Sequence, residues 1–313
     1  MWSRSLQSAP MNRRKLFRGP LAALAAAVLA ACTTPPSAPP APPVATAPAQ
    51  AARPLVLPRI GLALGGGAAR GFAHIGVIQV LEEAGIRPDL VAGTSAGSLV
   101  AALYASGKGG AELQKLALGM DESAITDWSF PTRGLIRGEA LARYVREQTG
   151  GKLIEQMVLP LGIVATDLDN GAGMLFQRGD TGVAVRASSA VPAVFQPVKI
   201  GSREYVDGGL VSPVPVHFAR QMGAEFVLAV DITSPPDGAP TGDAFKMLMQ
   251  TFSIMGRSIN TWELKEADVV VRPRLDGVGS ADFTARKRAI DAGRDAMRAL
   301  LPQLKAKIAA AMH

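Results

Sequence analysis

From about residue 59 to the end of the chain, short apolar runs alternate with segments of helical periodicity. The runs lack a strict apolar–polar alternation, which indicates strands covered on both faces of a sheet. This order of strands and helices predicts a three-layer α/β/α fold with a mostly parallel central sheet. The expected strands are residues 60–64, 90–92, 161–165, 174–176, 198–206, 226–230 and 269–271, and the expected helices include 71–83, 99–105 and about 282–312.

Residues 245–259 carry a stripe of large apolar side chains at helical spacing. The stripe consists of Phe245, Leu248, Met249, Phe252, Met255 and Ile259. We expect it to pack on the sheet, which is the usual place for one apolar face of a helix. The alternative is a soft lid or a surface for acyl chains, because Met side chains adapt to irregular partners.

The first 31 residues have the pattern of an export signal. Basic residues precede an apolar stretch at 21–30, which is too short to span a bilayer because a span needs about 20 apolar residues. Leu29-Ala30-Ala31-Cys32 resembles the lipobox of bacterial lipoproteins. We therefore expect a signal peptide at 1–31 and lipidation of Cys32, the only cysteine of the chain.

Residues 32–58 are rich in proline and alanine and lack the large apolar residues of a core. We expect them to form a semi-extended tether between Cys32 and a hydrolase domain at 59–313. The expected location is therefore the cell envelope, on the outer membrane or on the periplasmic face of a membrane. Two points stay open: export by the Sec or, through Arg13-Arg14, the twin-arginine route, and a start at Met1 or Met11.

The net charge argues against nucleic acid as a partner. The chain carries a formal charge of +7, but residues 1–31 hold five basic residues and no acidic one, which leaves +2 on the rest. A near-neutral body without basic runs offers no electrostatic attraction for a phosphate backbone.

Gly93-Thr94-Ser95-Ala96-Gly97 lies between an expected strand and an expected helix. Gly93 and Gly97 permit the sharp turn of a nucleophile elbow, which exposes the Ser95 hydroxyl at the end of a strand. Amides at the start of the following helix can help to hold an oxyanion. Ser95 is therefore the candidate nucleophile for acyl transfer.

A glycine-rich loop, Gly65-Gly66-Gly67-Ala68-Ala69-Arg70-Gly71, follows the first expected strand and opens a helix. Backbone N–H groups at such a helix N-terminus suit a nucleotide phosphate or an oxyanion. The dinucleotide fingerprint fails because its glycine spacing is one residue too long, and Gly-Lys-Ser/Thr of a Walker A motif is missing. We predict an oxyanion loop, with Arg70 tying it down, touching a phosphate head group, or lying on the surface.

Asp207, in Asp207-Gly208-Gly209, is the candidate proton acceptor. The chain has three histidines, and none carries a triad signature: His313 is terminal, His74 lies among apolar helix residues, and His217 follows Val-Pro-Val. An ordinary Asp, with a pKa of about 3.9, is a poor base for a hydroxyl. For Asp207 to act as a base, burial would have to raise its pKa. The alternative is that Asp207-Gly208-Gly209 is a plain turn after a strand.

In combination these blocks resemble the patatin-like phospholipases, and the bacterial members most closely. A fourth block, Ala-Ser-Ser-Ala-Val-Pro-Ala-Val-Phe-Gln-Pro at 187–197, adds to the resemblance, and all four occur in the family's order within about 59–230. The resemblance implies a Ser–Asp dyad in which Ser95 is the nucleophile and Asp207 the base. It assigns Gly65, Gly66, Gly67 and Ala68 to the oxyanion hole, and Arg70, Gly71, Gly93, Gly97, Gly208 and Gly209 to supporting loops.

The resemblance also implies a phospholipase A or lysophospholipase that works through an acyl-enzyme without cofactor or metal ion. The implied partners are a phospholipid or lysophospholipid substrate and, through Cys32, a membrane surface. No carboxylate or histidine cluster in the sequence suggests a catalytic metal. Two other functions stay open: a catalytically weak lipid-binding or envelope assembly protein, and a non-lipid esterase, thioesterase or peptidase on the same site.

Overall fold

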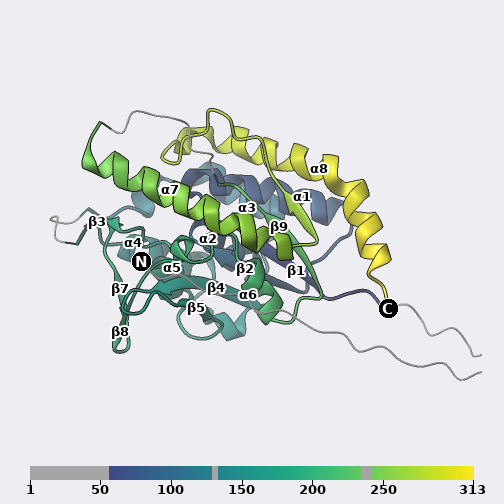
Figure 1. Ribbon diagram of the computed structural model, residues 1–313, viewed down its shortest axis with the longest axis horizontal. Helices are drawn as coiled ribbons and strands as arrows, with labels where there is room; N and C mark the ends of the chain where they lie inside the picture. The colour runs from purple at the N-terminus through teal and green to yellow at the C-terminus, as the bar shows by residue number, and fades with distance from the viewer. Residues whose placement is uncertain (1–55, 129–132, 234–241) are drawn as a thin grey trace, which may run out of the picture. The chain divides into compact units, whose positions relative to one another are not determined.

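The computed structural model describes residues 56–128, 133–233 and 242–313 (Figure 1). The expected signal peptide, Cys32 and nearly all of the expected tether lie outside these residues. Residues 53–313 form a compact unit of their own, separate from residues 1–52.

Eight strands of the described residues form the central sheet, and two more form a small separate sheet. The central sheet contains β1 (Ile60–Leu64), β2 (Leu90–Thr94), β4 (Leu161–Asp167), β5 (Gly173–Phe176), β7 (Val198–Ile200), β8 (Arg203–Asp207), β9 (Phe226–Val230) and β10 (Val269–Val271), and the small sheet contains β3 (Gly134–Ile136) and β6 (Ala193–Phe195).

Long helices and short 3-10 turns connect the strands. The helices are α1 (Ala73–Glu83), α2 (Ala96–Ala105), α3 (Gly110–Gly119), α4 (Glu139–Gln148), α5 (Thr181–Ser188), α6 (Val216–Gln221), α7 (Ala244–Glu263) and α8 (Arg286–Ala310). The 3-10 turns are η1 (Ala68–Phe72), η2 (Glu122–Ala124), η3 (Ile154–Gln156), η4 (Gly208–Leu210), η5 (Leu264–Glu266) and η6 (Phe283–Ala285).

The central sheet has the strand order β10-β9-β1-β2-β4-β8-β7, with β5 also paired to β4. All pairs from β10 to β4 are parallel, whereas β5, β8 and β7 join antiparallel at one end. The predicted α/β/α fold with a mostly parallel sheet is therefore confirmed.

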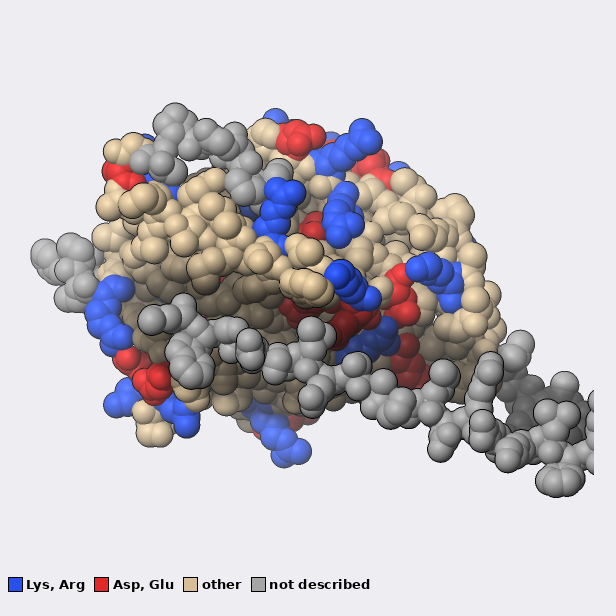
Figure 2. Space-filling view, viewed as in Figure 1, with Lys and Arg blue, Asp and Glu red and all other residues tan. Residues whose placement is uncertain are grey.

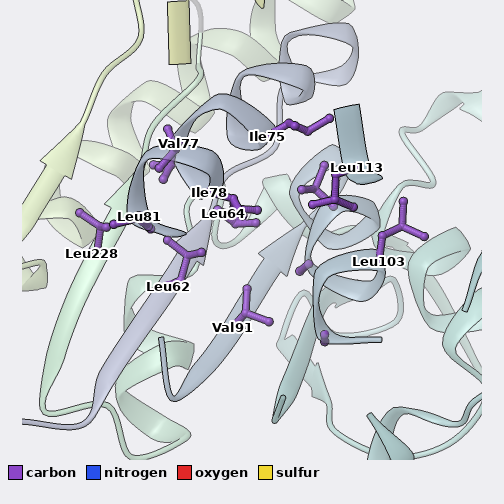
Figure 3. Close-up of a cluster of buried hydrophobic side chains, with 14 of the residues drawn as sticks. Leu62, Leu64, Ile75, Val77, Ile78, Leu81, Val91, Leu103, Leu113 and Leu228 are labelled. Atoms are coloured by element: carbon purple, nitrogen blue, oxygen red, sulfur yellow. The ribbon is translucent and has the colours of Figure 1, made fainter. Parts of the chain in front are cut away.

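Side chains of alternating size on the strands fit two different helical layers. Leu62 and Leu64 of β1 belong to the large apolar cluster beneath α1, α2 and α8, and Figure 3 shows them beside Ile78 and Leu81 of α1. Ala63, on the opposite face, belongs to the cluster beneath α6. Small side chains on that face let the short helix α6 approach the sheet closely, since little volume separates the two backbones.

Helices α1 and α8 cross at backbone contact distance. A Cβ added at Gly76 would overlap the carbonyl oxygen of Ile290, and one added at Gly293 would overlap that of Ala73. Glycine at both positions therefore lets the long C-terminal helix lie directly on α1.

Two expectations about elements were wrong. The apolar run at 198–206 is a hairpin of β7 and β8, because Gly201 adopts a φ of +63° and reverses the chain. The apolar stripe at 245–259 lies on α7 and does not pack on the sheet. Only Gly256 and Asn260 of this helix are buried.

Candidate active site

Ser95 occupies a strained turn between β2 and α2. Its φ of 53° and ψ of −123° lie in a region that L-residues rarely adopt. The turn needs its flanking glycines: a Cβ at Gly97 would overlap the Leu64 carbonyl oxygen, and one at Gly93 would lie 2.5 Å from the Gly97 oxygen. The sequence therefore holds Ser95 in the conformation of a nucleophile elbow, at the carboxyl end of a strand.

Ser188, at the end of α5, fixes the backbone of Ser95. The Ser95 N–H donates to Ser188 Oγ at 2.8 Å, and Ser188 Oγ donates to the Val164 carbonyl at 2.5 Å. Ser188 lies within the fourth sequence block, but the sequence analysis gave it no role. The available signal was a pair of serines in a mostly apolar motif.

Strand β4 brings Asp207 to Ser95. Thr94 pairs with Val164 on one side of β4, and Asp207 pairs with the next residue, Ala165, on the other side. Gly208 then passes close to this point, because a Cβ there would overlap the Val164 oxygen and lie 3.1 Å from the Thr94 methyl group. The sheet thus joins two motifs that are far apart in the sequence.

The Asp207 carboxylate is buried and incompletely hydrogen-bonded. Its Oδ1 accepts the N–H of Gly209 at 2.7 Å, while Oδ2 has no hydrogen-bond partner among the described residues. Burial raises the pKa of Asp207 to about 6, while the nearby Ser95 hydroxyl and the N–H of Gly209 act in the opposite direction and lower it. Among the described residues the Ser95 hydroxyl has no hydrogen bond of normal geometry, yet it lies close enough to Asp207 to lower the pKa of its carboxyl group. Such contacts often tighten only when substrate binds.

The glycine loop lies against Ser95, and its four predicted oxyanion residues differ in hydrogen bonding. A Cβ at Gly66 would lie 3.1 Å from the Ser95 Cβ. The N–H of Gly65 donates to the Val230 oxygen at 3.1 Å and that of Gly66 to the Pro213 oxygen at 2.8 Å. In the described part of the chain, the N–H groups of Gly67 and Ala68 have no such acceptor. They are therefore the loop amides available to a ligand.

Arg70 and His74 support this loop from inside the protein. Arg70 is 7% exposed and its Nε donates to the Gly67 oxygen at 3.4 Å, so the surface alternative for Arg70 was wrong. Gly71 lies against α2, where a Cβ would be 2.8 Å from the Ala96 Cβ. His74 is fully buried and its Nε2 lies 2.8 Å from the Gly65 oxygen, a contact that needs a proton on Nε2. Burial lowers the pKa of His74 to about 4, which keeps the ring neutral.

The other two histidines lie on the surface. His217 is two-thirds exposed and lies 3.6 Å from Glu266, and His313 is an exposed terminal residue that hydrogen-bonds Val56 through its backbone. Among residues 56–128, 133–233 and 242–313, no three His, Cys, Asp or Glu side chains come together as a metal site. In the same ranges, no helix has the length and apolar character required to cross a membrane.

Ser95 opens onto an apolar cavity of about 180 Å³. The walls come mainly from α2, α3 and α4 and the 189–195 segment, and they include Leu99, Leu103, Leu113, Leu141, Tyr144 and Phe195. Such a cavity favours a hydrocarbon chain, because each buried methylene contributes about 0.8 kcal/mol.

A partly buried chain of hydrogen bonds links the elbow to α7, and no sequence motif predicted it. Thr94 Oγ1 donates to the Ser212 oxygen at 2.8 Å, and Ser212 Oγ donates to Glu263 Oε1 at 2.5 Å. Burial raises the pKa of Glu263 to about 7. The last turn of α7 is thereby tied to the segment that follows Asp207.

Comparison with known proteins identifies the family of this chain. The sequence model of a family described as "Patatin-like phospholipase" matches residues 62–220. An uncharacterized NTE family protein of Mycobacterium tuberculosis is 38% identical over 190 residues, which is 60% of this chain and 52% of that protein. Patatin-like phospholipase domain-containing protein 6 of Mus musculus is 33% identical over 240 residues, covering 73% of this chain and 17% of that protein.

A solved structure shares the fold. VipD from Legionella pneumophila superimposes with a TM-score of 0.54 at 14% sequence identity, covering 79% of this chain and 67% of that one. The chain spans about half the length of the first curated relatives that it matches. Because the family match covers half of the sequence and includes the glycine loop, the elbow and Asp207, the chain belongs to the patatin-like phospholipase family.

Proposed function

We propose that the protein is a serine-dependent lipid acyl hydrolase of the phospholipase A or lysophospholipase type. One observation carries this proposal: Ser95 lies between a buried carboxylate, a loop with two available amides and an apolar cavity. These are the parts that acyl transfer from a lipid requires, namely a nucleophile, a base, an oxyanion site and a place for the chain. The family membership supports the same reaction class.

In the first half of the proposed reaction, Asp207 accepts the hydroxyl proton as Ser95 Oγ attacks the acyl carbonyl carbon. The N–H groups of Gly67 and Ala68 stabilise the tetrahedral oxyanion, with the acyl chain in the apolar cavity. Collapse breaks the ester bond, and the leaving alkoxide takes the proton from Asp207. A lysolipid or glycerol-phosphodiester departs, and an acyl ester of Ser95 remains.

In the second half, water replaces the leaving group. Asp207 accepts a proton from this water as its oxygen attacks the acyl carbonyl, and collapse returns the proton to Ser95 and releases the fatty acid. The elevated pKa of Asp207 matters in both halves, because a carboxylate of ordinary pKa is too weak a base for these proton transfers.

The location is a separate part of the proposal. The lipobox-like sequence before Cys32 and the Pro/Ala-rich segment after it support an envelope lipoprotein whose catalytic body is tethered to a membrane. Metabolic labelling with radioactive palmitate tests this: incorporation should require Cys32, and a Cys32→Ser chain should stay unlabelled. Equal labelling of both chains would contradict lipidation at this residue.

The activity is tested by fatty-acid release from phospholipid and lysophospholipid vesicles. We expect Ser95→Ala to abolish release and Asp207→Asn to lower it by about 10²–10⁴-fold, the range typical for loss of a general base. Ser202→Ala and Asp276→Asn, both at exposed positions, are matched controls that should leave release unchanged. A metal chelator should have no effect.

Other outcomes point to the alternative functions. Activity that survives Asp207→Asn would exclude the dyad. Ser95-dependent cleavage of simple esters or thioesters but not of lipids would indicate a non-lipid hydrolase. No turnover, together with failure of a fluorophosphonate probe to label Ser95, would favour a lipid-binding or assembly protein.

A further inference from the structure

Helix α7 buries only a glycine and an asparagine, whereas a helix in a protein core buries its large apolar side chains. The residues it buries are Gly256 and Asn260, and neither polar atom of the Asn260 amide has a hydrogen-bond partner among the described residues. Several of its large apolar side chains are exposed: Met247 is 58% exposed, Ile254 54% and Trp262 69%. Removal of such apolar surface from water is favourable, so α7 is stabilised if its outer face is covered.

The outer face of α7 combines apolar and cationic residues in the manner of an interfacial helix. Figure 2 shows that uncharged residues make up most of the surface along α7, which crosses the near face of the molecule in Figure 1. At 100° per residue, Lys246 and Arg257 lie on one flank of this face, and Lys246 also lies 3.4 Å from the exposed Asp243 carboxylate. At the C-terminal end, the ammonium group of Lys265 lies 3.9 Å from the centre of the Trp262 ring. Cations beside exposed apolar side chains complement an anionic, hydrocarbon-based surface.

The underside of α7 touches the candidate active site. It contacts η4, which follows Asp207 directly, and Gly256 lies against Pro213. The carbonyl of Pro213 accepts the N–H of Gly66 in the glycine loop. A surface that covers the outer face of α7 is therefore separated by this one helix from the elements that hold the dyad and the oxyanion loop.

We propose that α7 docks the protein on an anionic lipid bilayer, lying in the interface with its outer apolar side chains among the lipids. A 20-residue helix is about 30 Å long, and interfacial helices sink about 5–10 Å into the head-group boundary. This docking rests on the proposed function, since it brings the site to the surface that contains its substrate. It adds a contact that is independent of Cys32.

Vesicle binding by the chain from Arg53 onward tests the proposal, since residues 53–313 form a compact unit of their own. All chains carry Ser95→Ala so that the vesicles stay intact. We expect Met247→Gln with Ile254→Gln to weaken binding to phosphatidylcholine–phosphatidylglycerol vesicles by about tenfold or more. The matched control, Leu118→Gln with Val158→Gln, changes two exposed apolar residues elsewhere and should change binding less than twofold.

Two further measurements test whether α7 inserts into the bilayer and whether binding requires anionic lipid. In the chain from Arg53 onward, Trp128→Phe leaves Trp262 as the sole tryptophan. Its fluorescence should shift to the blue with vesicles and be quenched by brominated lipids. Vesicles of phosphatidylcholine alone should bind more weakly. An unshifted spectrum or equal binding to the two compositions would contradict interfacial docking on anionic lipid.

Hydrolysis by the active chain separates failure of this inference from failure of the proposed function. The double variant of α7 should cleave a soluble short-chain ester normally and lose activity on vesicles only. Unchanged vesicle binding together with normal ester cleavage would overturn the docking role alone. A dimer that the α7 substitutions convert to monomer, with vesicle binding unchanged, would make α7 a contact between two copies instead. Absence of Ser95-dependent cleavage of any ester would overturn the proposed function.

Discussion

Burial of the Asp207 carboxylate has opposite effects on reactivity and on stability. The pKa of about 6, above the ordinary 3.8, makes it a better base. The same shift means that the folded state prefers the protonated acid. Its stabilising contribution is therefore complete below pH 3.8 and is lost as the pH rises through 6. At neutral pH the folded protein holds a charge that would be more stable in water.

The pH dependence of the reaction follows from this pKa. Because the base must be ionised, kcat/KM for a soluble ester should rise about tenfold per pH unit below 6 and level off above about pH 7. Stopped assays between pH 4.5 and 8.5 measure the profile, and a melting curve at each pH serves as the control for unfolding. A profile that is flat across pH 6 would contradict a role for Asp207 as the base.

At the scale of elements, the crossing of α1 and α8 tolerates little change. Both helices come together over Gly76 and Gly293, with no room for a methyl group. In a close-packed interior such an overlap cannot be relieved by side-chain rotation, because the obstructing atoms are backbone carbonyls.

Gly293→Ala is therefore expected to destabilise the protein by about 3 kcal/mol, at the upper end of the usual cost of overpacking. Gly119→Ala is the matched control: Gly119 also lies in a helix, but a Cβ there meets no atom within 4 Å. Urea unfolding followed by circular dichroism compares the two. Equal midpoints for the two variants would show that α8 can move away from α1.

Strands that are buried on both faces were predictable from the sequence. Strands 60–64, 226–230 and 269–271 match β1, β9 and β10, since unbroken apolar runs suit a sheet covered on both faces. The hairpin at 198–207 was missed because the positive φ of Gly201, and not hydrophobicity, divides it. The exposure of α7 was missed because an amphipathic pattern specifies an apolar face and not the partner that covers it.

At the scale of the whole molecule, the sequence predicted the three α/β/α layers, but it did not predict which motifs come close together in space. Ser95, Asp207 and the glycine loop were named from local motifs, and their roles stay predictions. That Thr94 and Asp207 flank successive residues of β4 depends on strand order, which no local pattern encodes. The roles of Ser188 and of the Thr94–Ser212–Glu263 chain could not be predicted, because their hydrogen-bond partners are distant in sequence.

The two ends of the compact body also meet. The N–H of Val56 donates to the His313 oxygen at 2.8 Å, and the His313 N–H donates back at 3.3 Å. A chain that starts at Arg59 should melt about 2–6 °C below one that starts at Arg53, because two backbone hydrogen bonds are lost. Val56→Ala in the longer chain keeps both bonds and should melt with it. Identical melting of the short and long chains would show that this pairing contributes nothing.

The strand order has a further consequence for how the proposed activity arises during synthesis. Ser95 leaves the ribosome with β2, but Asp207 follows only after β4, β5 and β7, and it reaches Ser95 only when β8 pairs with β4. A nascent or prematurely ended chain therefore holds a nucleophile without its base. The proposed dyad therefore forms only once β8 has joined β4, and a nascent chain that ends before Asp207 should lack the proposed hydrolase activity.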